Sequence, residues 1–178
     1  MRVGLDAALA AIDAANAVDP KSADQGLRGT YWLHRLCDEP DLAVEIAVRA
    51  HHLKRSAIPR ATFPDGRLGY RRWRAAQKEA LAVSLREALV GFDAELVERV
   101  VSLGQRVGLG ADADAQFVED AACLVFCETD LVDLHARLGD DKTLDAVRKT
   151  VAKMSPFAVG LVGEATPPGP TRDLLRRV

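Results

Sequence analysis

At 178 residues the chain has the length of one domain, long enough to bury a hydrophobic core without disulfides or metals. Hydrophobic residues make up 48% of it but aromatic residues only 5%, which favours close-packed helices over a sheet. The net charge is −2, no stretch approaches 18 uncharged apolar residues, and the first residues lack a signal-peptide pattern. We therefore expect an all-α cytoplasmic protein with no membrane association.

Apolar residues recur at three- and four-residue spacing in seven segments, the pattern of amphipathic helices. These segments are 3–17, 27–37, 41–55, 69–90, 93–107, 115–138 and 142–154. Asp41 and Asp93 can cap the third and fifth helices, and Gly91 and Gly139 are typical helix terminators. The sequence predicts a single compact domain of about seven helices.

Two segments interrupt this pattern because their prolines and glycines forbid a continuous helix. Residues 57–69 form a predicted loop that holds Arg60 and Arg67. After about residue 164 a proline cluster begins, so we expect the folded domain to span 1–164 and a basic tail to span 165–178.

Charge is distributed unevenly along the chain. Residues 49–74 carry eight Lys and Arg and only one acid, Asp65, whereas residues 111–145 carry ten acids. This positive segment can be balanced internally by the acidic segment, or it can bind a negatively charged ligand.

His51 and His52 lie at the end of the apolar run 42–50. Adjacent helical residues are about 100° apart, so only one of the two can point squarely at the core while the other lines its edge. The pair predicts either a histidine in a cavity or a buried, hydrogen-bonded histidine beside an exposed one.

Glu119 and Asp120 lie within an otherwise apolar helix, where a carboxylate is costly to bury unless a cation, a proton or a metal compensates it. Either histidine, Arg55 or a divalent metal would be a suitable partner. These carboxylates predict a functional site or a structural ion pair between helices. Cys37, Cys123 and Cys127 fit neither a disulfide framework nor a zinc pair and are expected to be reduced thiols.

A basic loop supplies the third candidate group. Arg and Lys side chains beside rigid prolines suit carboxylates and phosphates, and the residues concerned are Lys54, Arg55, Arg60 and Arg67. Tyr70 and Trp73 follow among further arginines, which is seen in nucleic-acid-binding helices, but aromatics at this spacing often mark a packing face. The overall acidity argues against nucleic acid as a partner.

Several motifs together resemble the family known as domain of unknown function 4202. They are D-P at Asp19, R-A-x-H-x-x-R and I-P-R within Ala47–Arg60, Y-x-x-W-R at Tyr70–Arg74, E-D-x-A-C-L-V-F at Glu119–Phe126 and R-K-T-x-x-K-M-S at Arg148–Ser155. The resemblance spans about residues 10–157 and implies no established activity. Some members carry a glutamyl-tRNA synthetase label, yet this chain has no Gly-rich nucleotide-binding loop.

The chain also departs from that family pattern. Relatives tend to have a His-Ala pair where Leu81 and Ala82 align, and a lysine near Gln105. If that histidine is a ligand or base in relatives, this chain lacks it, which argues against catalysis here.

A more distant likeness is to HD-domain phosphohydrolases, which bind metal between core helices. It implies that His51-His52 replaces the His-Asp pair, with Asp120 as the later acid and His34 upstream. The missing aspartate would leave at most one divalent metal.

We expect a pocket between the histidine helix, the Arg60 loop and the helix of Glu119 and Asp120. It would bind a small anionic, phosphorylated ligand through Lys54, Arg55, Arg60 and Arg67. His52, Glu119 and Asp120 would act in any catalysis, and His51, His52 and Asp120 would hold a metal. The alternatives are a non-catalytic interaction protein with structural ion pairs, and an RNA-associated protein with one exposed basic stripe. Oligomeric state cannot be predicted.

Overall fold

A computed structural model describes residues 2–177, and within them every regular element is a helix. The all-α prediction is confirmed, but the expected number of about seven is wrong, because the described residues form ten α-helices and three 3-10 helices. These are α1 Arg2–Asn16, α2 Pro20–Leu36, α3 Leu42–Arg49, η1 Arg55–Ala57, η2 Arg60–Thr62, α4 Gly66–Ala88, α5 Ala94–Gly104, α6 Ala113–Thr129, α7 Leu131–Leu138, α8 Asp140–Val151, α9 Pro156–Ala165, α10 Pro170–Leu174 and η3 Leu175–Arg177.

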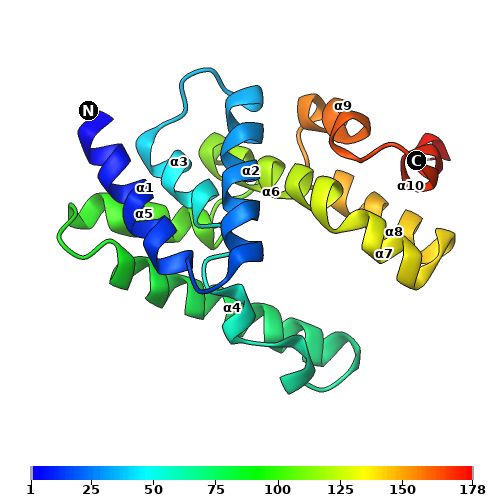
Figure 1. Cartoon of the computed structure of the whole chain (residues 1–178), viewed down its shortest axis with the longest axis horizontal. Coiled ribbons are helices and arrows are strands. Elements are labelled where there is room, and N and C mark those ends of the chain that lie inside the picture. The colour runs from blue at the N-terminus through cyan, green and yellow to red at the C-terminus, as the bar shows by residue number, and fades with distance from the viewer. Residues whose placement is uncertain (1, 178) are drawn as a thin grey trace.

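Helix α6 is the central element of the fold. It packs against α2, α3, α5, α7 and α9, and it runs across the molecule with α1–α5 on one side and α7–α10 on the other (Figure 1). Its buried residues lie around most of its circumference, including Val118, Leu124 and Val125. Helix α6 is therefore amphipathic only weakly, as expected for a helix covered on several faces.

Two predicted helices end earlier than expected. The third stops at Arg49 because the chain turns through residues 50–54, where Lys54 adopts a left-handed φ of 51°. The sixth divides at Asp130, whose side chain is bound by Lys21 and Gln25 of α2. Residues at both breaks line the cleft described below.

The loop between α3 and α4 is held tightly against α4. Trp73 Nε1 and Gln77 Nε2 both donate to the carbonyl oxygen of Ile58, each at 2.9 Å. A Cβ atom on Gly69 would lie 1.8 Å from the carbonyl oxygen of Pro64, so only glycine fits this crossing. The loop is thus a fixed wall, and the first turns of α4 extend beyond the bundle (Figure 1).

The segment predicted as a tail is packed in its described part. Helix α10 contacts α7, and η3 contacts α8. Thr171 and Leu174 are buried, because the proline cluster turns the chain back instead of releasing it. Within residues 2–177, no helix has the length and apolar character needed to cross a membrane.

Candidate anion-binding site

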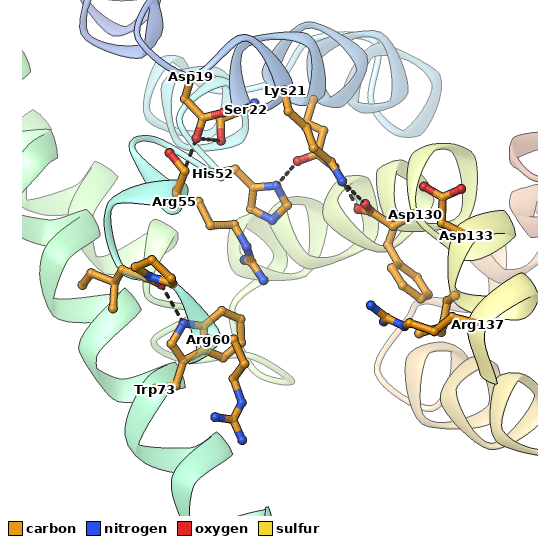
Figure 2. Close-up of a pocket in the computed structure, with 16 residues that line it drawn as sticks. Asp19, Lys21, Ser22, His52, Arg55, Arg60, Trp73, Asp130, Asp133 and Arg137 are labelled. Atoms are coloured by element: carbon orange, nitrogen blue, oxygen red, sulfur yellow. Dashed lines mark hydrogen bonds and ion pairs between the residues drawn. The ribbon is translucent and has the colours of Figure 1, made fainter. Parts of the chain in front are cut away.

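A cleft of about 550 Å³ lies between α2, the α3–α4 loop, α4 and α7 (Figure 2). A second hollow of about 410 Å³ adjoins it on the side of α6 and α8. The two hollows share five lining residues, namely His52, Arg55, Phe126, Asp130 and Leu134. We treat them as one cleft with His52 and Arg55 at its centre.

The hydrogen-bond network determines the tautomer of His52. Gln25 Nε2 donates to Thr129 Oγ1 at 2.9 Å and to Asp130 Oδ2 at 2.8 Å, so its Oε1 must face His52. His52 Nδ1 contacts that oxygen and is therefore the protonated nitrogen. His52 Nε2 consequently carries a lone pair.

His51 has the opposite tautomer. Arg106 Nη2 lies 2.7 Å from His51 Nδ1, and because a guanidinium only donates, this nitrogen must accept. The proton of His51 is then on Nε2. The two imidazole rings lie with centroids 4.0 Å apart and planes inclined by 31°, so a donor and an acceptor stand side by side.

Both Nε2 atoms are open to the cleft. Neither has a hydrogen-bond partner among residues 2–177. Every fully buried side-chain nitrogen or oxygen in the described chain does have a partner, so these two atoms are accessible. Burial and the neighbouring cations, Arg55 and Arg106 among them, hold the pKa of both histidines well below 6.5. Both imidazoles are therefore neutral at neutral pH.

Three cations around the histidines form no ion pair among the described residues, although Asp130 acts electrostatically on Arg55 and Glu119 on Lys78. Arg55 lies over the Trp73 ring at 5.2 Å, and Arg74 and Lys78 reach the same region from α4. Burial and the nearby Arg74 charge lower the pKa of Arg55 and of Lys78. The centre of the cleft is thus positively charged.

Glu119 is compensated within the protein. Its Oε2 accepts from Arg106 Nε at 2.9 Å and its Oε1 from Lys153 Nζ at 2.7 Å. Burial alone would raise the pKa of Glu119, but the charges and hydrogen bonds of these two cations lower it overall. Glu119 lines the cleft as an ionised carboxylate that positions Arg106 under His51.

Asp120 is not brought to the cleft, although it follows Glu119 in sequence. It is 1% exposed, and its Oδ1 accepts from Gln116 Nε2 and from the backbone N–H of Ser155, both at 2.9 Å. Asp120 therefore fastens the start of α9 to α6.

The predicted anion ligands divide into two groups. Arg55 and Arg60 line the cleft, but Arg60 donates to the carbonyl oxygens of Phe63 and Pro64 and so stabilises the loop. Lys54 pairs with Glu87 outside the cleft, and Arg67 lies at the start of α4, exposed.

The residues present do not fit the predicted divalent metal. In the described chain, no three His, Cys, Asp or Glu side chains gather in a way that could hold one. A cation at the histidines would also face Arg55, Arg74 and Arg106 in the same hollow. His34, the possible upstream ligand, lies 3.8 Å from Glu45 and lines no part of the cleft.

Sequence reasoning missed four residues that build the site: Gln25, Arg74, Arg106 and Lys153. Gln25 and Arg106 lie 27 and 55 residues from their histidine partners. Only Arg74 and Lys153 carried a signal, since both fall within the family motifs.

The fold and the cleft define an all-α protein with a cationic, histidine-containing cleft beside its central helix. The chain belongs to the family described as domain of unknown function (DUF4202), which matches residues 6–175. No curated protein and no solved structure matches the chain.

Proposed function

We propose that this cytoplasmic protein binds a small, phosphorylated anion in the cleft, with Arg55 and Arg74 holding the anion. His51 Nε2–H donates a hydrogen bond to the ligand, and His52 Nε2 accepts one from a ligand hydroxyl or protonated phosphate oxygen. The observation that supports this proposal is the pair of open, oppositely protonated imidazoles beside cations that form no ion pair within residues 2–177.

The charges of the cleft support an anion. Arg106 and Lys153 share the single negative charge of Glu119, and Asp130 pairs with Lys21. Arg55, Arg74 and Lys78 form no ion pair within residues 2–177, and leaving the half-buried guanidinium of Arg55 without a direct counter-charge is costly. A phosphate would supply that counter-charge and match the fork of an arginine.

The histidines favour binding over catalysis. His52 is unprotonated at neutral pH, as a general base must be, but a pKa well below 6.5 makes it a weak base. Leu81 lines the small hollow beside the histidines, at the position where the family resemblance implies a histidine. We propose a binding protein related to enzymes rather than a metal-dependent, HD-like hydrolase.

A second candidate is a non-catalytic interaction protein whose charged groups serve the fold. The Glu119 triad favours it, because Arg106 and Lys153 compensate that carboxylate directly. Under this candidate, phosphate compounds would neither bind nor stabilise the protein.

Thermal-shift and calorimetric titrations with inorganic phosphate and glycerol phosphate decide between the two. We expect phosphate to raise the melting temperature of the wild type more than that of Arg55→Gln. The affinity of Arg55→Gln for phosphate should be lower than that of the wild type by about ten-fold or more. Lys54→Gln is the matched control. It removes one positive charge from the residue next to Arg55, but the Lys54 side chain lies outside the cleft, where it pairs with Glu87. Absence of binding, or equal binding by both variants, would overturn the proposal.

A further inference from the structure

A row of cations leads from the cleft along α4. Arg67, Arg71, Arg74 and Lys78 follow one another at spacings of four, three and four residues, which places them within about 60° of one helix face. All four are exposed. At 1.5 Å per residue the row, here called the α4 stripe, is about 16 Å long.

The α4 stripe is unpaired among the described residues, although Glu119 acts electrostatically on Lys78. Among residues 2–177, none of its four side chains forms an ion pair or a side-chain hydrogen bond with another residue. Arg86, exposed near the other end of α4, does pair with Glu98 at 2.7 Å. Ion pairing along α4 thus differs between Arg86 and the four residues of the stripe. The two stripe residues nearest the cleft, Arg74 and Lys78, line a hollow together with the histidines.

The stripe is larger than a single phosphate requires. Arg55 and Arg74 suffice for one phosphate group in the cleft, whereas Arg71 and Arg67 lie about one and two turns closer to the start of α4. The first turns of α4 project beyond the bundle (Figure 1). A ligand that uses all four cations must carry several negative charges in a line. That is the chemistry of a phosphodiester or polyphosphate chain.

An aromatic surface beside the stripe favours nucleotides over inorganic polyphosphate. Tyr70 is 51% exposed, lines the cleft, and lies 5.7 Å from the Trp73 ring, which Arg55 covers. Unpaired bases stack on such side chains while cations follow the backbone.

We infer, on the basis of the proposed function, that the cleft receives the terminal phosphate of a single-stranded nucleic acid whose next phosphates lie along the α4 stripe. The overall acidity of the chain does not oppose this, because the positive charge is local. Two other basic residues of the positive segment are already engaged and do not belong to the stripe. Arg49 pairs with Asp13, and Arg60 donates to carbonyl oxygens of the loop.

Fluorescence anisotropy with labelled single strands of about six nucleotides tests the inference. RNA and DNA are each prepared with a 5′-phosphate, with a 3′-phosphate and without a terminal phosphate. We expect one phosphorylated end to bind best. The double variant Arg67→Gln/Arg71→Gln should bind about ten-fold more weakly or worse, with a salt dependence reduced by about 1.4 in the log–log slope.

The control is Arg72→Gln/Arg148→Gln, which removes two equally exposed charges away from the stripe and should retain wild-type binding. Equal losses in both double variants, equal binding of phosphorylated and unphosphorylated strands, or equally tight binding of inorganic polyphosphate would overturn the inference.

Failure of the two proposals looks different. If the proposed function fails, inorganic phosphate does not stabilise the wild type, and this inference falls with it. If only this inference fails, inorganic phosphate stabilises the wild type and Arg67→Gln/Arg71→Gln equally, yet single strands bind no more tightly than phosphate itself.

Discussion

At the scale of single residues, the two adjacent histidines differ because their Nδ1 atoms meet different partners. His52 Nδ1 faces the carbonyl oxygen of Gln25, whose orientation Thr129 and Asp130 determine, while His51 Nδ1 faces Arg106. One ring thus offers a donor and the other an acceptor to the same space. The sequence predicted a cavity-lining histidine as one of two readings, but the tautomers depend on distant residues.

For Glu119, the need for a compensating group could be predicted from the sequence, but the residues that compensate it could not. A carboxylate in an apolar helix requires compensation, and cations supply it. Their identity could not be predicted, because Arg106 follows α5 and Lys153 follows α8. For Asp120 the partner outside α6 is a backbone N–H, that of Ser155, which has no sequence signature.

Removing the Glu119 carboxylate should destabilise the protein. In Glu119→Ala the guanidinium of Arg106 remains buried without its partner, so we expect the free energy of unfolding to fall by about 3 kcal/mol. Glu98→Ala breaks an exposed pair with Arg86 of similar geometry and should cost much less. Urea denaturation measures both, and equal losses would contradict a structural role for Glu119.

At the scale of elements, the start of α2 is joined to the wall of the cleft by one carboxylate. Asp19 accepts from Ser22 N at 3.1 Å, Ser22 Oγ at 2.9 Å and Ser56 N at 3.2 Å. It therefore caps α2 and holds the loop after α3 in place. Burial would raise the pKa of Asp19, but the hydrogen bonds from Ser56 and Ser22 lower it to about 2.

This lowered pKa predicts a loss of stability in acid. The unfolded chain binds the proton at its ordinary pKa of 3.8 and the folded protein only at about 2. The stabilisation is therefore complete only above about pH 5 and is lost progressively as the pH falls through the folded pKa. It amounts to at most about 2 kcal/mol. Asp19→Asn keeps a capping side chain that does not titrate.

Unfolding free energies measured from pH 5 to pH 2 compare the two proteins. The wild type should lose more stability than Asp19→Asn over this range. Parallel curves would show that Asp19 does not hold the α2 start and the loop in the way the hydrogen bonds indicate.

Periodicity predicted most of the helices, including those that begin at the capping residues Asp41 and Asp93. It failed for α9, whose apolar residues surround the helix instead of forming a stripe. It also failed at the Asp130 break, because the groups that bind this residue lie on α2. Local pattern identifies a helix, whereas contacts across the fold decide where it ends.

At the scale of the whole molecule, the cleft lies where two groups of helices diverge from α6. Its lining comes from α2, the α3–α4 loop, α4, α6, α7 and α8. Three walls were predicted, and all three line the cleft. They are the histidine segment, the Arg60 loop and the Glu119 segment. The contributions of α2 and α7 could not be predicted, since Gln25 and Asp130 act through contacts more than a hundred residues apart.

The most direct test of the central claim is a long-range ¹H–¹⁵N NMR spectrum of the four imidazoles with and without phosphate. We predict that His51 is protonated on Nε2 and His52 on Nδ1, and that phosphate shifts both Nε2 signals but not those of His34 or His135. The shifts should disappear in Arg55→Gln. Identical tautomers in His51 and His52, or Nε2 signals that phosphate leaves unchanged, would contradict the account.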